Sequence, residues 1–192
     1  MANKLELGIS PEESREIFRQ YVRTDNLIKH CIATEAIMRA LARRLGEDEG
    51  LWGMAGLLHD LDFEETKEDP PSHGLKTAQV LAEKGVSGII IQAIKAHNAE
   101  ALGIQRTQSI DSALTAAENI TGLIVATALV YPDRKLSSVK VSSVIKRMKE
   151  KAFAKNVRRE AILECQKLGL SLEEFVGISL KAMQDLSQDL GL

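Results

Sequence analysis

The feature that most constrains the fold is the spacing of apolar side chains, which recur every three or four residues between helix-starting and helix-ending residues. In residues 25–45, for example, Leu27, Ile37 and Leu41 share one face, and Gly46 can end the helix in a left-handed turn. The chain has only four prolines in 192 residues and an aromatic content of 4%. Such a composition suits helices better than strands, so the sequence predicts an all-α fold.

Eight to nine helices are expected, packed as one compact bundle. Ser10, Pro11 and Glu13 form a capping box with proline at the first helical position, and Ser171 with Glu174 repeats the box at the last helix. The charged stretch 64–71 ends in two prolines and is expected to be a loop. The expected helices cover residues 11–22, 25–45, 48–61, 72–85, 87–97, 109–130, 138–153, 156–168 and 171 onwards.

Length and charge restrict the organisation and the partners. A chain of 192 residues is expected to form a single domain, 1–192, with the site in a core of about 25–131 and C-terminal helices in about 138–192. Lys and Arg number 25 against 27 Asp and Glu, a net charge of -2. This balance gives no general attraction to nucleic acid or to an anionic membrane, so neither is expected as a partner. The sequence leaves a homodimer open.

The expected location is the cytoplasm. Cys31 and Cys165 are the only cysteines, and both fall in helical patterns, which favours a reducing compartment over a disulfide framework. Residues 1–10 show no secretory signal. The longest nearly apolar run, 120–130, is shorter than the roughly 20 residues of a membrane-spanning helix.

An adjacent histidine and aspartate, His59 and Asp60, close an apolar helical run. His30 lies upstream on an inward helical stripe, and Glu118 lies downstream on the patterned face of the most apolar expected helix. Imidazole nitrogens and carboxylate oxygens bind divalent metals, which need several donors converging from rigid elements. A carboxylate on an apolar face is costly unless it is paired or bound to a cation. The four side chains therefore predict a metal centre.

Each of these residues also has an ordinary structural interpretation. Adjacent helical residues point about 100 degrees apart, so the doublet can flank one ion only near a helix end, and alone it would more often cap a surface helix. His30 alone suits a hydrogen-bonded core histidine. Glu118 could instead be half of a buried ion pair with Arg39 or Arg43. The joint occurrence of the residues, in order, on three helices favours the metal.

In this order the residues resemble the HD-domain superfamily of metal-dependent phosphohydrolases. That pattern is a histidine, a His-Asp doublet and an aspartate on a later helix. Here it falls on His30, His59, Asp60 and Glu118, the last being longer than the usual Asp by one methylene but still able to bind through oxygen. Over most of the chain, four motifs look like those of small bacterial HDIG-type or predicted HD hydrolases: AGLLHDLDF (55–63), DPPSHG (69–74), KAHN (95–98) and AENITG (117–122).

The remaining histidines, His73 and His97, fall between the doublet and Glu118. In binuclear branches of the superfamily, two histidines in this interval complete a second metal site bridged by the Asp of the doublet. The resemblance therefore implies one ion or two, and two ions about 3.5 to 4 Å apart would clamp the attacking and leaving oxygens of a phosphoryl transfer. Alternatively, His73 sits in the first turn of a helix and His97 near the end of one, where an imidazolium complements the helix dipole.

The expected chemistry is hydrolysis by a metal-activated water. The ion lowers the pKa of the water and neutralises a phosphate oxygen, so no protein nucleophile is required. Asp60 is expected to hold the ion, and Asp62 or Glu65 to orient the water, unless these loop carboxylates simply face solvent. The donor set suits Mn, Fe, Co, Ni, Zn or, less well, Mg.

A phosphate ester also needs cationic donors. Lys76 is expected to share a helix face with the histidine three residues before it. Arg106 lies in the loop 102–108, and Lys146 lies on the basic helix to which the resemblance extends. These three are predicted substrate contacts, whereas the other lysines of that helix suit a solvated face.

The residues and the family resemblance allow three functions. The first is a metal-dependent phosphohydrolase, a phosphomonoesterase or phosphodiesterase, that acts on a nucleotide or another small phosphate ester. The second is a catalytically silent HD module that binds a nucleotide or a protein partner, with Glu118 marking the loss of activity. The third is a diiron oxygenase, because a few binuclear members bind dioxygen instead of hydrolysing phosphate.

Overall fold

A computed structural model describes residues 7–192 of the chain, and within that range it contains helices and no strand. The all-α prediction is confirmed, and eight of the α-helices in the described part are eight residues or longer. The stretch 1–10, where no secretory signal is expected, falls mostly outside the described residues. The helices are α2 (Pro11–Tyr21), α3 (Asp25–Leu45), α4 (Glu49–Leu58), α5 (Phe63–Thr66), α6 (Leu75–Glu83), α7 (Gly88–His97), α8 (Ala99–Leu102), α9 (Ser109–Leu129), α10 (Val141–Met148), α11 (Arg159–Ile162), α12 (Leu172–Asp185) and α13 (Ser187–Leu190), with 3-10 turns η1 (Pro70–Ser72), η2 (Leu136–Ser138) and η3 (Leu163–Leu168).

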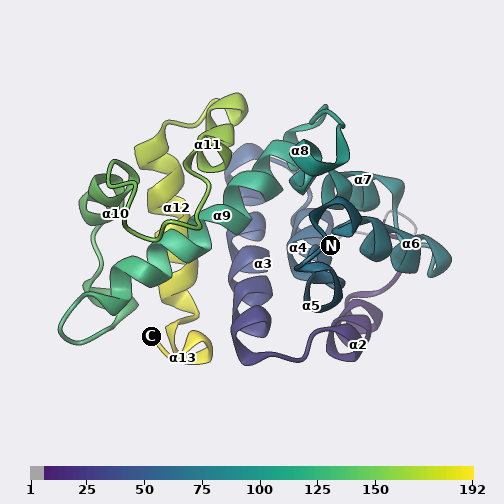
Figure 1. Ribbon diagram of the computed structural model, residues 1–192, viewed down its shortest axis with the longest axis horizontal. Helices are drawn as coiled ribbons and strands as arrows, with labels where there is room; N and C mark the ends of the chain where they lie inside the picture. The colour runs from purple at the N-terminus through teal and green to yellow at the C-terminus, as the bar shows by residue number, and fades with distance from the viewer. Residues whose placement is uncertain (1–6) are drawn as a thin grey trace.

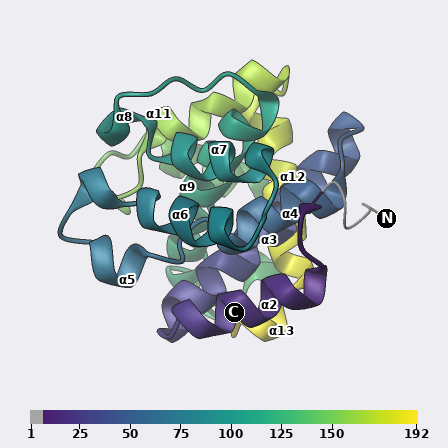
Figure 2. The same ribbon diagram turned by 90° about the vertical axis from the view of Figure 1, so that its right-hand side faces the viewer.

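Two long helices, α3 and α9, cross at the centre of the molecule (Figure 1). The helices α4 to α8 lie on one side of α3, and α10 to α12 lie on the other. A view at right angles places α6 and α7 in front of α9, with α5 at the edge of the same half (Figure 2). One hydrophobic cluster runs through both halves, from Leu7 to Leu190. The side chains of α3, α4, α7 and α9 can therefore meet in one place.

The close packing of α4 on α3 depends on a glycine. A Cβ atom added at Gly56 would lie 2.9 Å from the Cα atom of Glu35 and 3.0 Å from the carbonyl oxygen of Thr34. Both of these atoms belong to the backbone of α3, so they cannot give way as a flexible side chain could. The missing side chain lets the end of α4 approach α3, and this end carries His59.

The long helices agree with the sequence predictions, but the shorter segments do not. The capping box of Ser10 and Glu13 is present in full. At Ser171 only half of it forms, because the Glu174 side chain contacts Arg44 instead of returning to the cap. The expected loop 64–71 contains α5 and η1, and the expected C-terminal helices 138–153 and 156–168 are reduced to α10 and to α11 with η3.

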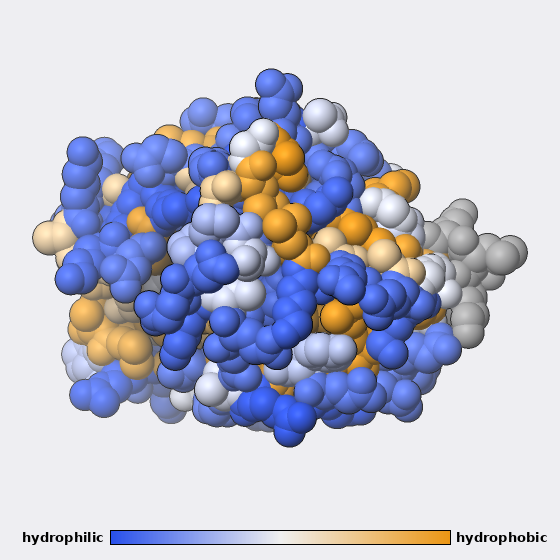
Figure 3. Space-filling model, turned by 45° about the vertical axis from the view of Figure 1, so that its right-hand side comes forward, coloured by the Kyte–Doolittle hydropathy of each residue, from blue (hydrophilic) through white to orange (hydrophobic). Residues whose placement is uncertain are grey.

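The apolar helix α9 is long and apolar enough to cross a membrane by length and composition alone. However, 72% of its most apolar window is buried inside the molecule. This is the burial of a core helix. The face of the molecule seen in Figure 3 is mostly hydrophilic, with hydrophobic side chains gathered from its upper middle toward the right.

Candidate metal centre

The histidines and Asp60 come from separate elements that meet beside α9. His30 lies in the second turn of α3, and His59 follows the last residue of α4. His73 lies between η1 and α6 in extended backbone, and His97 ends α7. His73 is therefore not in the first turn of a helix, because α6 begins only after Gly74.

Asp60 lies between two pairs of histidines and turns one oxygen toward each. Its Oδ2 atom is 3.6 Å from the Nε2 atom of His30 and 3.5 Å from that of His59. Its Oδ1 atom is 3.2 Å from the Nε2 atom of His73 and 3.7 Å from that of His97. Two groups suited to a metal thus share one carboxylate, and within each group the ligand atoms lie within 4.8 Å of one another. Of the described residues, His30, His59 and Asp60 form the first group, and Asp60, His73 and His97 the second.

The other ring nitrogen of each imidazole is held by the protein. The Nδ1–H of His59 donates to the carbonyl oxygen of Gly56 at 2.9 Å, and that of His97 donates to the carbonyl of Ile94. The Nδ1–H of His73 donates to Oδ1 of Asp62 at 2.8 Å. Such support fixes the orientation of a metal-binding histidine and leaves Nε2 toward the ion.

His30 is oriented by Thr121. The hydroxyl of Thr121 donates to the carbonyl oxygen of Glu118 at 2.6 Å, so its oxygen is left to accept from the Nδ1–H of His30 at 3.0 Å. In this tautomer the Nε2 atom of His30 carries a lone pair, and so does that of His59.

These two Nε2 atoms lie 3.1 Å apart. When Nδ1 of each ring carries the hydrogen that it donates to Thr121 or Gly56, two nitrogen lone pairs and the Oδ2 atom of Asp60 face one another. Such an arrangement of acceptors is unfavourable without a cation, and a divalent metal satisfies all three. The donor set therefore fits a metal ion.

Burial and nearby charges lower the pKa of two histidines of the cluster and raise the pKa of a third. Burial, with the neighbouring His59, lowers the pKa of His30 to about 4, and burial with His59 and His73 lowers that of His97 to about 3. Burial also lowers the pKa of His73, but hydrogen bonds to Asp60 and Asp62 outweigh it and raise the pKa to about 9. Burial would raise the pKa of Asp60, yet the surrounding histidines hold it well below its usual range. At neutral pH the metal-free centre thus contains an imidazolium at His73.

Asp62 supports His73 and the start of α6. Its Oδ2 atom accepts from the backbone N–H groups of Gly74 and Thr77, both at 2.9 Å, while Oδ1 accepts from His73. The side chain is buried and both oxygens are occupied, which corrects the expectation that Asp62 orients a water. Glu65, the other candidate for that role, is exposed and pairs with Lys76.

Glu118 lies beside the cluster without joining either group. Its Oε1 atom is 3.3 Å from Arg158 and accepts from the amide of Asn119. Burial raises the pKa of Glu118 to about 8, helped by the negative charge of Asp60 and opposed by Arg158. The ion-pair partner is Arg158, neither Arg39 nor Arg43, and a direct bond from Glu118 to a metal stays a prediction.

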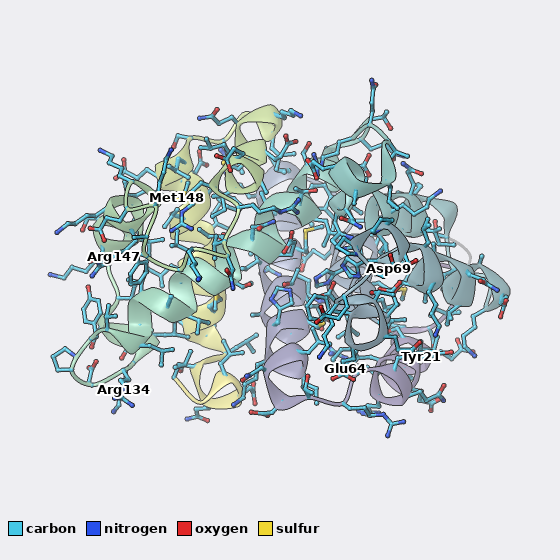
Figure 4. The ribbon with its side chains drawn as sticks, in the orientation of Figure 1. Tyr21, Glu64, Asp69, Arg134, Arg147 and Met148 are labelled. Atoms are coloured by element: carbon cyan, nitrogen blue, oxygen red, sulfur yellow. The ribbon has the colours of Figure 1, made fainter. Side chains whose placement is uncertain are left out.

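The three predicted phosphate contacts, Lys76, Arg106 and Lys146, lie in different parts of the molecule. Lys76 is exposed and pairs with Glu65, and it cannot share a helix face with His73, which precedes the helix. Arg106 is largely covered and binds Glu100 through two nitrogens, at 2.7 and 2.9 Å. Lys146 lies on α10, whose labelled neighbours Arg147 and Met148 are at the opposite end of the molecule from Glu64 of α5 (Figure 4).

Two hollows lie near these elements. One, of about 910 Å³, lies between α2, α3 and α4, and the buried Glu35 beside it is already paired with Arg15 and Arg39. The other, of about 370 Å³, is lined partly by Glu100, Arg106 and Lys167. The second is connected to the surroundings of the cluster, because its lining residue Glu100 also contacts Arg158, which pairs with Glu118.

Sequence reasoning missed the roles of Thr121, Asn119 and Arg158. The motif AENITG supports the family resemblance and supplies the predicted ligand Glu118, but the sequence gives no role to its asparagine or threonine. In the structure its threonine holds His30, and its asparagine accepts from the backbone N–H of Arg158 at 3.3 Å. For Asn119 and Thr121 the available signal is that they lie four residues after Thr115 and three after Glu118, as polar residues within the mostly buried α9.

The comparisons with known proteins agree with this arrangement. A family model described as HD domain matches residues 27–128, which run from the start of α3 to the end of α9. The chain is 31% identical over 113 residues to ribonuclease Y of Clostridium tetani, covering 57% of this chain and 21% of that protein. The chain thus spans about a fifth of the length of this relative. No solved structure was found to match it.

Proposed function

Because the chain belongs to the HD-domain family, we propose that it is a metal-dependent phosphohydrolase with two divalent ions that share Asp60. The observation that carries the proposal is the position of Asp60, whose two oxygens each face a separate pair of imidazole Nε2 atoms. His30 and His59 would hold one ion, and His73 and His97 the other. Glu118 would be a further protein donor, because the negative charge of Asp60 contributes to the raised pKa of its carboxyl group.

The residues behind the ligands have separate tasks in this proposal. Ions bound there would supply Lewis-acid activation of a water molecule and would neutralise phosphate oxygens. The carbonyl of Gly56 and the hydroxyl of Thr121 hold the rings of His59 and His30 in place. Asp62 holds the ring of His73 in the same way. The negative charge of Asp62 also balances the positive charge of that ring when the ring is protonated.

The proposed substrate is a small phosphate ester, with a nucleotide as the first candidate. The relative from Clostridium tetani is named a ribonuclease, so its reaction cleaves phosphodiesters. This chain covers only 21% of that protein, and its net charge of -2 gives no general attraction to a nucleic acid. A small, cytoplasmic phosphate ester therefore suits the chain better than RNA.

The test is phosphate release by the purified protein. The protein would be incubated with an aryl phosphate, an aryl phosphodiester and a nucleotide panel, each with Mn²⁺, Fe²⁺, Co²⁺, Ni²⁺, Zn²⁺ or Mg²⁺. Metal-dependent turnover that is lost in Asp60→Asn is expected, whereas Asp25→Asn, at a carboxylate that is 77% exposed, should keep it. Metal content without turnover on any ester would support a silent module, and two redox-active irons without phosphatase activity would support an oxygenase.

A further inference from the structure

One cation beside the centre has no role in the chemistry described so far. Arg158 follows the loop 149–157, outside the matched family region, and its side chain is 42% exposed. One nitrogen of its guanidinium lies 3.3 Å from Oε1 of Glu118 and 3.4 Å from the carbonyl oxygen of His97. Arg158 thus contacts both Glu118 and the backbone of His97, a member of the histidine cluster.

The fold holds this arginine in place from three sides. Asn119 of α9 accepts from its backbone N–H. The preceding residue, Val157, packs on Gly122, where an added Cβ would come within 3.1 Å of the valine side chain. The following residue, Arg159, donates to the carbonyl oxygens of the loop, namely those of Glu150, Phe153, Ala154 and Val157. The position of Arg158 is therefore fixed by the backbone around it, while its own side chain stays accessible.

The ion pairs of Arg158 are of a kind that a phosphate can replace. Its contacts with Glu100 and Glu118, at 3.1 and 3.3 Å, each use a single pair of atoms. Glu100 is already bound by two nitrogens of Arg106 at shorter distances. The pair with the exposed Glu100 contributes little to stability, whereas an arginine and a phosphate can form two parallel charge-assisted hydrogen bonds.

The surroundings of Arg158 also leave room for a substrate. Glu100, Arg106 and Lys167 are among the residues that line the hollow of about 370 Å³. Pockets for small molecules have volumes of about 300 to 1,000 Å³. Arg158 therefore contacts Glu100, which lines this hollow, and Glu118, which lies beside the metal-binding groups.

We propose that Arg158 is a phosphate-binding residue of this centre, which exchanges its contacts with Glu100 and Glu118 for the non-bridging oxygens of a phosphate ester. This inference rests on the proposed function for its biological meaning. It assigns the phosphate contact to the C-terminal part of the chain, which the matched family region does not include.

The test is the binding of inorganic phosphate, measured by calorimetry with Mn²⁺ and again with a chelator. Arg158→Gln should weaken phosphate binding about tenfold or more, as expected for loss of hydrogen bonds to a charged group. Its metal content should stay that of the wild type. Arg158→Lys keeps the charge and should recover part of the affinity. Lys155→Gln removes one exposed positive charge from the same loop and should bind phosphate like the wild type.

Phosphate affinity unchanged in Arg158→Gln would overturn the proposal, and so would an equal loss in Lys155→Gln, because then only net charge matters. The metal content distinguishes this failure from failure of the proposed function. If the wild type takes up no metal, the two-ion hydrolase is wrong. The role of Arg158 is then decided by comparing the phosphate affinity of the wild type with that of Arg158→Gln in the presence of the chelator.

Discussion

At the scale of single residues, the candidate centre depends on the group behind each imidazole. Thr121 is the clearest case, since its hydroxyl both donates to a backbone carbonyl and accepts from His30. Thr121→Val has nearly the same shape but lacks this acceptor, so His30 loses the bond that orients it. Loss of such a supporting bond typically costs about 10- to 100-fold in metal affinity. A titration with Mn²⁺ against a chelating dye would measure the loss.

Thr121→Ser is the matched control for this variant, because it keeps the hydroxyl and should keep the affinity. Unchanged affinity in Thr121→Val would show that the threonine only fills space beside His30.

Proton release on metal binding is expected from His73. Its pKa is raised to about 9, so the ring carries a proton at pH 7, and Nε2 must lose that proton before it can bind an ion. Affinity for the ion at this position should therefore rise with pH up to about 9. Calorimetry at pH 7 in buffers of different ionisation enthalpy should show about one proton more released by the wild type than by His73→Ala. Equal release by both proteins would contradict a protonated His73.

The residue types that carry the chemistry could be read from the sequence, but their supporting partners could not. His30, His59, Asp60, His73 and His97 were chosen for their donor atoms, and the structure brings these five together. The partners that orient them lie as many as 91 residues away, as Thr121 does from His30. No local pattern encodes such a pair, because it exists only once α3 and α9 cross.

At the scale of elements, the approach of α4 to α3 sets the position of the doublet. Gly56→Ala would place a methyl group against the backbone of α3 and push the two helices apart. Overpacking of this kind typically costs about 1 to 3 kcal/mol, and metal affinity should fall as well because the Gly56 carbonyl holds His59. Urea denaturation and metal titration would measure both effects.

Gly53→Ala is the matched control on the same helix. The atoms nearest to an added Cβ there belong to the side chain of Arg39, which can shift at the expense of its ion pair with Glu35, whereas the backbone of α3 cannot. Its loss of stability should therefore be smaller than that of Gly56→Ala. Equal losses in the two variants would show that the close backbone approach is not what makes Gly56 necessary.

The long helices were predictable because each has a local stripe and local caps, as α2 and α3 do. The segment around His73 was not predictable from the sequence. The backbone N–H groups of Gly74 and Thr77 at the start of α6 are capped by Asp62, which lies 12 and 15 residues earlier. A cap supplied from outside the helix leaves no signature beside it, so the sequence predicts a start at residue 72, whereas α6 begins at Leu75.

At the scale of the whole molecule, the metals should act as a clamp between elements that are far apart in the sequence. The proposed ligands come from α3, the end of α4, the segment before α6 and the end of α7. A ligand that binds only the folded state at 100 times its dissociation constant stabilises it by about 2.7 kcal/mol. Mn²⁺ should therefore raise the melting temperature of the wild type, and a chelator should reverse the rise.

Asp60→Ala should lose this response to metal while keeping its helical circular dichroism signal, because Asp60 would be shared by both ions. His73→Ala and His97→Ala should each lower the metal stoichiometry from about two toward one without emptying the first position. If Asp60→Ala responds to Mn²⁺ like the wild type, its carboxylate is not a shared ligand.

The central claim is that Asp60 bridges two metal ions, and anomalous X-ray diffraction from crystals grown with Mn²⁺ tests it most directly. The account predicts two anomalous peaks about 3.5 to 4 Å apart. One should lie against the Nε2 atoms of His30 and His59, the other against those of His73 and His97, with an oxygen of Asp60 bound to each. A single peak would contradict the two-ion centre, and peaks remote from Asp60 would contradict the site itself.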